Sequence, residues 1–402
     1  MSIFEAFVLV GAVVWLANLL APWGAWRTRE CLNAESSSAM KLSDYPSVSI
    51  LIPARNEALV IAQTLRGIER QTPDIPVRIV NDQSTDDTKE VSLKSKLPIQ
   101  VIDGLPPPAG WAGKLWALEQ GLKHVDTEFV LIMDADIDLQ SGILEKMMLK
   151  ARSENIDFLS LMAELNFASF WERLLMPAYI YFFKLLYPFS LANSARSNFS
   201  SGAGGCILVR KAVFERIGGY RAIKDALIDD CSLAKAVKSA GFKTWIGLTR
   251  SVQSHRAYEG LGEIWQLVAR SAFTYLRYSA FLLFVCSLLM VAAFWFLPLS
   301  LFILPTGSVL FWISCAGCTA MLAAYIPTLR FYGLSPLWSL FLPVSGSLYL
   351  SMTWTSAISY WRGKRSAWKG RVYDKNLRAS EDSDQKGNDN DVGKGEKIHQ
   401  VG

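Results

Sequence analysis

Acidic residues at the ends of apolar segments are the side chains of this chain best suited to chemistry. The apolar run 129–133 leads into Asp134 and Asp136, which one residue separates. Because side chains alternate along an extended chain, both carboxylates are expected on the same side, just beyond a buried strand. Two carboxylates there can share a divalent cation, which in turn can hold a diphosphate. Taken alone, the motif has a plainer alternative, namely two solvated aspartates in a surface turn.

Other polar residues have comparable positions. Asp82 ends an expected strand, Asp229 and Asp230 precede an expected helix, and Lys114 opens another. A helix start is suited to an anion, and its dipole would keep Asp230 ionised. Ordinary helix capping is the alternative for the aspartate pair, although a cap needs only one aspartate. These residues could form a site with three parts: a metal-bound diphosphate, a carboxylate that contacts a base or ribose, and a separate general base. Such a site would suit transfer from an activated phosphate donor to a hydroxyl.

Strands that alternate with helices would have to position these residues. The expected strands are 48–53, 77–82, 99–103 and 129–133, and the expected helices between them are 56–70 and 115–123. Such alternation implies right-handed crossovers and a mostly parallel, Rossmann-like sheet, which is an α/β fold. Ligands of open α/β sheets bind at the carboxyl ends of the strands, where these acidic residues fall.

The composition indicates a soluble domain joined to membrane segments. Of the 402 residues, 51% are hydrophobic and 19% are charged, and the mean hydropathy is +0.22. The chain is therefore too apolar for an ordinary soluble enzyme and too charged for a pure membrane bundle. Its net charge of +5 is modest, and the basic residues are scattered or adjoin apolar runs. This distribution favours a membrane surface over nucleic acid.

Apolar runs at both ends predict membrane helices. The run 3–22 is long enough to span a bilayer, which takes about 20 residues, and the arginines that follow predict a cytoplasmic domain. Of the later runs, 280–304 and 308–326 are expected to span, whereas 336–358 is interrupted and is expected to be re-entrant or interfacial. If all three crossed, the basic residues 362–371 would lie outside, against the positive-inside rule.

The expected organisation has five parts. They are an N-terminal transmembrane helix 1–24, a linker 25–44, a catalytic domain 45–279, a C-terminal transmembrane region 280–360, and a basic segment with a disordered tail 361–402. Within the domain, the aromatic segment 167–190 is expected to lie in the membrane interface, because aromatic side chains favour that zone. Burial in the domain core is the alternative for this segment.

Motifs along the domain resemble the ordered signature of family 2 glycosyltransferases with a GT-A fold. These motifs are Pro53-Ala-Arg-Asn-Glu57, Asn81-Asp82-Gln-Ser-Thr-Asp86, Asp134-Ala-Asp136 and Ile228-Asp229-Asp230. Further stretches resemble the hopene-associated glycosyltransferases of hopanoid-producing bacteria, among them Trp111-Ala-Gly-Lys-Leu-Trp116 and Ala272-Phe-Thr-Tyr-Leu-Arg-Tyr-Ser279. The resemblance covers roughly residues 45–300, and 368–373 near the end.

The resemblance implies a donor site. Asp82 would contact the uracil or ribose of a UDP-sugar, Pro53 and Glu57 would line the nucleotide pocket, and Lys114 would face the diphosphate. Asp134 and Asp136 would bind a divalent metal, Mg²⁺ or Mn²⁺, and Asp134 would also contact the nucleotide diphosphate.

The resemblance also implies an acceptor base. Asp230 would deprotonate the acceptor hydroxyl, with Asp229 in the usual acidic position before it, and the reaction would invert the anomeric carbon. Many membrane members carry Gln-x-x-Arg-Trp after the base. The nearest match here is Thr274-Tyr-Leu-Arg277-Tyr278, so Arg277 is expected to contact the diphosphate, and processive polymer synthesis is not supported. His255 is a candidate third metal ligand, with an ordinary surface histidine as the alternative.

The resulting hypothesis is a multi-pass enzyme of the bacterial inner membrane with a cytoplasmic catalytic domain. It would transfer a sugar from a UDP-sugar to a membrane lipid, related to hopanoids by the resemblance. A carotenoid, ceramide-like lipid, glycerolipid or polyprenyl phosphate remains open as the acceptor. A non-catalytic nucleotide-binding scaffold is the alternative from another class. No nucleic-acid partner is expected, and the sequence identifies no protein partner.

Overall fold

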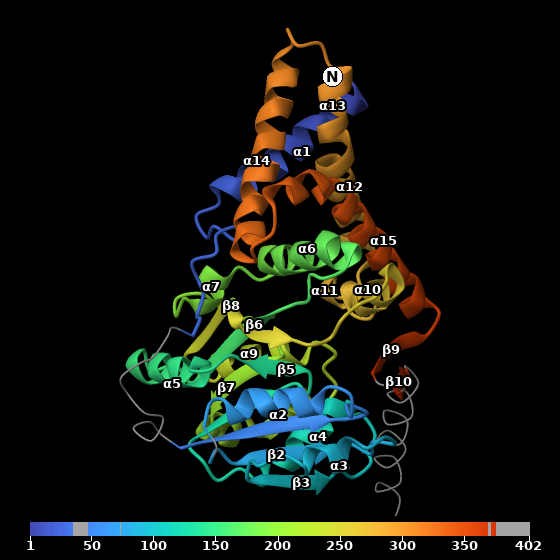
Figure 1. Ribbon diagram of the computed structural model, residues 1–402. Helices are drawn as coiled ribbons and strands as arrows, with labels where there is room; N and C mark the ends of the chain where they lie inside the picture. The colour runs from blue at the N-terminus through green and yellow to red at the C-terminus, as the bar shows by residue number, and fades with distance from the viewer. Residues whose placement is uncertain (35–46, 73, 369–370, 375–402) are drawn as a thin grey trace, which may run out of the picture.

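A twisted sheet covered by helices forms one end of the molecule, and a bundle of apolar helices forms the other (Figure 1). The computed structural model describes residues 1–34, 47–72, 74–368 and 371–374. The eight strands follow the spatial order β3-β2-β1-β4-β7-β6-β8-β5. Their bounds are β1 Val48–Ala54, β2 Val77–Asn81, β3 Ile99–Asp103, β4 Phe129–Met133, β5 Ile137–Leu139, β6 Phe158–Glu164, β7 Cys206–Arg210 and β8 Thr244–Ser254.

The sheet is mostly parallel, as predicted. Strands β3, β2, β1 and β4 pair in parallel, and so do β6 and β8. Strand β7 is antiparallel to β4 and β6, and β5 is antiparallel to β8. Every residue of β1 and β4 is buried, because helices cover both faces, and this explains the unbroken apolar runs of these two strands. The predicted α/β fold class is confirmed.

Alternate residues of the central strands enter two separate cores. Ile50 and Leu131 pack on one face with α2 (Ile61–Glu69) and α5 (Ile143–Ser153). Leu51 and Val130 pack on the opposite face with α4 (Gly113–Leu122), α8 (Lys211–Ile217) and α9 (Asp229–Ser239). The period-two alternation of side chains along each strand produces this division.

One helix begins later than the sequence predicts. The helix expected over 56–70 is α2, which begins at Ile61. The backbone N–H groups of Asn56, Glu57 and Ala58 instead donate to side chains of the loop after β2, which leads into α3 (Thr88–Ser92). Asn56 also has a positive φ of 53°, which a helix does not allow. The segment after β1 is therefore a fixed loop at the carboxyl edge of the sheet.

Helices long and apolar enough to cross a membrane occur at the predicted places in the described chain. They are α1 (Ile3–Leu20), the continuous helix from Ala280 to Ile303, which comprises α12 (Ala280–Val291), η3 (Ala292–Phe296) and α13 (Leu297–Ile303), and α14 (Val309–Phe331). These three candidates run alongside one another away from the sheet domain (Figure 1). Helices are thus present at the predicted 280–304 and 308–326, and each is long and apolar enough to span a bilayer.

The third C-terminal run differs from these helices. It forms η4 (Pro336–Phe341) and α15 (Leu342–Trp361), which is not among the candidate spans. Figure 1 shows α15 descending obliquely from the base of the bundle to α10 (Leu261–Ala269). The strands β9 (Lys364–Trp368) and β10 (Arg371–Asp374) follow at the same end as the sheet domain. If only these three candidates span, the basic segment is expected on the side of the domain, which agrees with the positive-inside rule.

Helix α6 (Phe170–Leu186) forms most of the aromatic segment 167–190 and lies between the sheet domain and the bundle (Figure 1). It begins with a capping box in which Ser169 and Glu172 satisfy each other's backbone N–H groups. The Tyr181 hydroxyl accepts a hydrogen bond from Asn18 of α1 at 2.7 Å, and Ser345 of α15 donates to the Leu174 carbonyl at 2.9 Å. Helix α6 is thus hydrogen-bonded to α1 and α15 and packs between the sheet domain and the helix bundle.

Short elements complete the described chain. They are α7 (Phe189–Asn193), η2 (Gly219–Ile223) and α11 (Ala272–Tyr275). Two predictions fall partly or wholly outside the described residues: the linker, of which 35–46 are not described, and the disordered tail over 375–402.

Candidate functional site

A cavity of about 250 Å³ opens at the carboxyl edge of β1 and β4. We call it the acidic pocket. Six of the residues that the sequence singles out line it, namely Pro53, Glu57, Lys114, Asp134, Asp136 and Asp229. The tertiary structure thus brings together residues from the ends of two strands and the starts of two helices, at the sheet edge where α/β proteins bind ligands.

Lys114 is the cation at the centre of the acidic pocket. It lies in the first turn of α4, and its Nζ is 2.8 Å from Asp134 Oδ1 and 3.2 Å from Asp229 Oδ2. Burial alone would lower the pKa of Lys114, but Asp134, Asp229 and Asp230 outweigh it and raise that pKa. Burial, with repulsion from Asp136, raises the pKa of Asp134 despite the lysine. The pocket therefore holds a permanently charged ammonium among carboxylates.

Asp230 lies beside this cluster in the first turn of α9. Its Oδ1 accepts a hydrogen bond from the Cys231 backbone N–H at 2.7 Å, and the Gly204 backbone N–H also donates to the carboxylate. Burial and the adjacent Asp229 nevertheless raise the pKa of Asp230 to about 7. A carboxylate with such a pKa can accept and return a proton near neutral pH.

The glycine loop after α7 allows the backbone to approach Asp230. A Cβ on Gly202 would lie 2.6 Å from the Asp230 carbonyl oxygen, which is closer than real Cβ contacts. A Cβ on Gly204 would lie 3.5 Å from both Asp230 Oδ2 and Lys114 Nζ. The glycine loop therefore packs directly against Asp230, and Gly202 is sterically required there.

Asp136 is paired with a cation that the sequence did not single out. Arg256, just beyond β8, places Nε 3.6 Å from Asp136 Oδ2 and Nη2 3.8 Å from Glu57 Oε1. Ser254 Oγ donates to the same Asp136 oxygen at 3.1 Å. Each carboxylate of the Asp-Ala-Asp motif thus has its own basic partner, Lys114 for Asp134 and Arg256 for Asp136.

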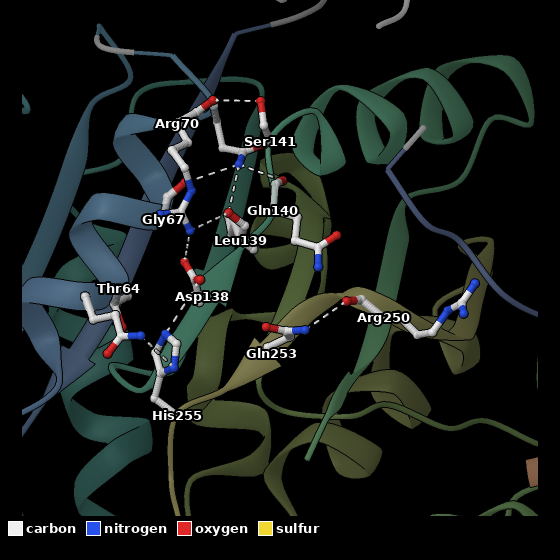
Figure 2. A network of polar contacts seen from close by, with 12 residues as sticks. Thr64, Gly67, Arg70, Asp138, Leu139, Gln140, Ser141, Arg250, Gln253 and His255 are labelled. Atoms are coloured by element: carbon white, nitrogen blue, oxygen red, sulfur yellow. Dashed lines mark hydrogen bonds and ion pairs between the residues drawn. The ribbon is translucent and has the colours of Figure 1, made fainter. Parts of the chain in front are cut away.

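The backbone of the Asp-Ala-Asp motif is held from both sides. Thr64 Oγ1 of α2 donates to the Ala135 carbonyl at 2.7 Å, and the His255 N–H donates to the Asp136 carbonyl at 2.8 Å. Beyond the motif, Arg70 of α2 pairs with Asp138 of β5, as Figure 2 shows. These bonds fix the direction of the two carboxylates before any ligand arrives.

His255 belongs to this supporting network. Figure 2 shows its ring beside Asp138, with Nε2 3.7 Å from Asp138 Oδ2, and Nδ1 lies 3.1 Å from the Gln63 amide. The side chain is only 17% exposed, so it is not the surface histidine of the alternative interpretation. Nδ1 thus contacts Gln63, whereas Nε2 is buried without a hydrogen-bond partner among the described residues, and the ring lies beside Asp138 of β5.

The donor set suits a hard divalent cation completed by a substrate. Among the described residues, no group of three or more His, Cys, Asp or Glu side chains is arranged around one metal position. Mg²⁺ and Mn²⁺ commonly bind through one or two carboxylates together with substrate phosphates and water. Asp134 and Asp136, both on the wall of the acidic pocket, are the residues that fit this requirement.

Two predicted donor-site residues are not brought into the acidic pocket. Asp82 is fully buried, and its backbone carbonyl accepts a hydrogen bond from Arg55 at 2.7 Å. Arg277 is exposed in the turn between α11 and α12, where its φ is +52°. Tyr278, the aromatic residue of the same match, stacks on Tyr360 at the end of α15 with 4.3 Å between ring centroids. Arg277 is therefore not among the residues that line the acidic pocket, because the turn carries the chain on into α12.

The pocket contains further basic and aromatic residues that sequence reasoning missed. Besides Arg256, Tyr258 and Arg270 line it. The Arg270 side chain makes no hydrogen bond or ion pair within the described ranges, so its guanidinium is available to an anion. The single basic residue of the helical segment 261–272 was the available signal for Arg270. The sequence signal for Arg256 was weaker, because Arg256 follows β8 and the pairing of β8 with β5 leaves no pattern in the neighbouring residues.

Comparison with known proteins agrees with this architecture. Residues 49–218 match the family model described as Glycosyl transferase family 2. A 4,4'-diaponeurosporenoate glycosyltransferase of Staphylococcus aureus is 36% identical over 95 residues, which are 23% of this chain and 25% of that protein. The protein of the same name from a second strain is 35% identical over 95 residues. The chain thus spans about a quarter of the length of the curated relatives that it matches.

Solved structures show more distant similarity. S. aureus TarS gives a TM-score of 0.40 at 16% identity, with 82% of this chain and 60% of that chain covered. The glucosyl-3-phosphoglycerate synthase of Mycobacterium tuberculosis in complex with phosphoglyceric acid gives 0.39 at 13% identity, with 62% and 86% covered. The fold class therefore rests on the sheet topology of this chain and on the family match.

Proposed function

We propose that this protein is a membrane-bound, inverting glycosyltransferase that moves a sugar from a UDP-sugar to a hydroxyl group of a membrane lipid. The observation that carries the proposal is the position of Asp230. It lies beside the Lys114–Asp134–Asp229 cluster, on an edge of the domain that faces the helices below the membrane bundle. A charged donor on one side and an apolar acceptor on the other would meet at this carboxylate.

Basic residues of the acidic pocket would bind the donor diphosphate. Lys114, Arg256 and Arg270 all line the pocket, and the first two already neutralise Asp134 and Asp136. Asp134 and Asp136 would hold a divalent metal, Mg²⁺ or Mn²⁺, which when bound neutralises charge on the leaving diphosphate. Pro53 and Glu57 would line the nucleoside end, with buried Asp82 supporting the loop behind them.

Asp230 would act as the general base. It would take the proton of the acceptor hydroxyl while that oxygen attacks the anomeric carbon from the side opposite the diphosphate. The bond between the anomeric carbon and the diphosphate oxygen breaks, UDP leaves with the bonding electron pair, and the configuration inverts. The raised pKa of Asp230, about 7, is close to the value that makes proton transfer efficient at neutral pH.

Two kinds of lipid acceptor have specific support. The stretches that resemble hopene-associated glycosyltransferases support a hopanoid-related acceptor. The relative named 4,4'-diaponeurosporenoate glycosyltransferase supports a carotenoid-type skeleton, although its name denotes a carboxylate where a hydroxyl is proposed here. The bacterial inner membrane, with the catalytic domain in the cytoplasm, is the proposed location, because basic residues flank the membrane helices on the domain side.

A donor screen on the purified protein tests the function. The full chain in lipid nanodiscs would be supplied with a panel of UDP-sugars, Mg²⁺ or Mn²⁺, and lipid extract, and UDP release and new glycolipids would be measured. The expected result is UDP release that depends on one sugar, on lipid and on Asp230. A protein that binds a UDP-sugar but releases no UDP with any lipid would instead be the non-catalytic scaffold.

A further inference from the structure

A second, larger cavity of about 350 Å³ lies between α6, α11 and the membrane helices. We call it the membrane chamber. Residues of α1, α6, α12 and α15 line it, among them Trp15, Phe182, Cys286 and Tyr349. Its volume is within the range of about 300–1,000 Å³ that small-molecule sites usually have. The acidic pocket shares none of these residues, so the chamber is a separate space in the described structure.

The interior of the membrane chamber is apolar and neutral. In the described ranges, all the side chains that line it are uncharged. Its polar groups are largely bonded within the protein: the Asn18 amide donates to Tyr181, the Thr353 hydroxyl to the Tyr349 carbonyl, and the Tyr349 hydroxyl to the Leu175 carbonyl. Such a lining favours a hydrocarbon and disfavours an ionised group, whose desolvation nothing there would compensate.

One wall of the membrane chamber adjoins the residues next to the proposed base. Tyr275 on its wall contacts Tyr187 edge-on, with 6.0 Å between ring centroids, and Tyr187 donates a hydrogen bond to Cys231, the residue after Asp230. Tyr179, also on the wall, is near enough that burial and Asp230 raise its pKa to about 12. Within the part of the chain that the structure describes, neither the Tyr179 nor the Tyr275 hydroxyl has a hydrogen-bond partner.

The other end opens toward the membrane. Leu289 of α12 lines the chamber and is 41% exposed, and Leu186 at the end of α6 is 50% exposed. Leu289 belongs to a row of exposed apolar residues on a helix long enough to span a bilayer, which also includes Phe284 and Leu288. A molecule dissolved in the bilayer could thus enter beside α12 without crossing water.

We propose that the membrane chamber binds the hydrocarbon body of a neutral lipid acceptor and presents its hydroxyl to Asp230 between Tyr179 and Tyr275. This inference rests on the proposed function and narrows it. A lipid alcohol fits, because its single polar group would meet the two unpaired phenol hydroxyls. A polyprenyl phosphate does not fit, because its phosphate would lie next to Asp230 in a neutral chamber.

Photolabelling tests the binding site without catalysis. The full-length protein in nanodiscs would be irradiated with a long-chain primary alcohol that carries a diazirine in its chain, and labelled peptides would be mapped by mass spectrometry. Labels are expected on chamber-lining segments of α6 and α12, and excess unlabelled alcohol should remove them. Labels confined to outward-facing residues such as Phe302 or Trp312 would overturn the proposal. A tail-labelled phospholipid that labels the chamber and resists displacement by the alcohol would mean that a structural lipid occupies it.

A matched pair of cysteine substitutions supplies the second test. Cys286→Trp would fill the chamber, whereas Cys315→Trp places the same side chain on α14, at another half-buried membrane position outside the chamber lining. Cys286→Trp should abolish displaceable photolabelling and raise KM for the long-chain alcohol at least tenfold, with KM for the UDP-sugar unchanged. Cys315→Trp should change neither value. Equal KM values for the alcohol in both variants would contradict the proposal.

The proposed function and the proposed acceptor site can be disproved separately. If no UDP-sugar is turned over by the wild-type protein, the proposed function is wrong, whatever the photolabelling shows. If the sugar is transferred to lipid but Cys286→Trp, with an unchanged unfolding temperature, still binds the alcohol normally, the function holds and the chamber is not the acceptor site. A Cys286→Ala variant, which empties rather than fills the position, should retain displaceable labelling.

Discussion

Lys114 Nζ lies 2.8 Å from Asp134 Oδ1, an ion pair that joins the first turn of α4 to the end of β4. The same ammonium is 3.2 Å from Asp229, so one cation connects the donor carboxylates to the helix that carries the base. An arriving diphosphate would compete for this ammonium, which couples donor binding to the position of α9.

Replacement of Lys114 should therefore weaken transfer more than folding. Lys114→Met is expected to lower kcat/KM for the UDP-sugar by about 100- to 1,000-fold, the usual cost of removing one pre-organised charge donor. Lys123→Met, an exposed position just after the end of the same helix, is the control and should leave kcat/KM within twofold of the wild type. A normal kcat/KM in Lys114→Met would show that the ammonium does not contact the donor.

Asp230→Asn tests the general base. The variant should lose about 100- to 10,000-fold in kcat, because the amide cannot accept the proton, while the Kd for UDP measured by calorimetry stays near the wild-type value. Asp126→Asn, an exposed aspartate outside the acidic pocket, serves as the control for loss of a carboxylate. A fall in UDP affinity as large as the fall in kcat would assign Asp230 to the donor instead.

The pH dependence of transfer follows from the same residue. The base must be ionised, and its pKa is about 7, so kcat/KM should decline as the pH is lowered through 7 and level off above it. The decline should approach about tenfold per pH unit, as for loss of a single essential proton acceptor. A kcat/KM profile that is flat from pH 5 to 8 would be inconsistent with this assignment.

The raised pKa of Asp230 also predicts a change in stability. A carboxyl that is protonated more readily in the folded state favours folding at acidic pH, and this contribution is lost as the pH rises through the folded-state pKa of about 7. Asp230→Asn should therefore have a higher Tm than the wild type at pH 8, and a similar Tm near pH 4. Thermal unfolding in detergent at both pH values measures the difference, and a lower Tm at pH 8 would contradict it.

Gly202→Ala tests the close approach of the glycine loop to α9. The added Cβ would lie 2.6 Å from the carbonyl oxygen and 3.0 Å from the carbonyl carbon of Asp230, which are both backbone atoms. We expect a loss of about 1–3 kcal/mol in unfolding free energy, as for other overpacked sites, with a fall in kcat because Asp230 must shift. Gly260→Ala, where a Cβ meets nothing within 4 Å, is the matched control. An unaffected Gly202→Ala variant would mean that α9 can move without cost.

Removal of the divalent cation should stop transfer. Chelation is expected to abolish UDP release, and Mg²⁺ or Mn²⁺ should restore it, because Asp134 and Asp136 provide the only carboxylate pair separated by one residue on the wall of the described acidic pocket. Asp136→Asn should raise the metal concentration for half-maximal rate by about tenfold or more, in line with the loss of a charged ligand. Full activity in chelator would instead favour Lys114, Arg256 and Arg270 as sufficient for the diphosphate.

Much of the donor edge could be predicted from local sequence. The apolar runs of β1 and β4 could be recognised because strands buried on both faces have a composition of their own, and the run of β4 leads into Asp134. Lys114 and Asp229 could also be recognised as candidate site residues from the sequence, because each lies at the start of a helix next to the sheet edge. These are patterns within a few neighbouring residues, and the fold class followed from their alternation.

The tertiary structure alone decided which distant residues complete the site. Arg256 reaches Asp136 because β8 pairs antiparallel with β5, a contact between segments more than 100 residues apart that leaves no local pattern. Arg270, not Arg277, lines the acidic pocket, because the chain turns at Arg277 with a positive φ and continues into α12. A motif match compares residues in sequence order, so it gives no information about such a turn.

The membrane chamber depends still more on packing. The sequence by itself determined an α/β sheet with acidic strand ends and apolar helices at both ends of the chain, because these features follow from periodicity and composition. It did not determine where α6 would lie, and α6 forms the chamber by crossing beneath α1, α12 and α15. The position of an aromatic helix against three others depends on many contacts between residues far apart in the sequence. Only the folded chain could therefore place Tyr179 of α6 near Asp230.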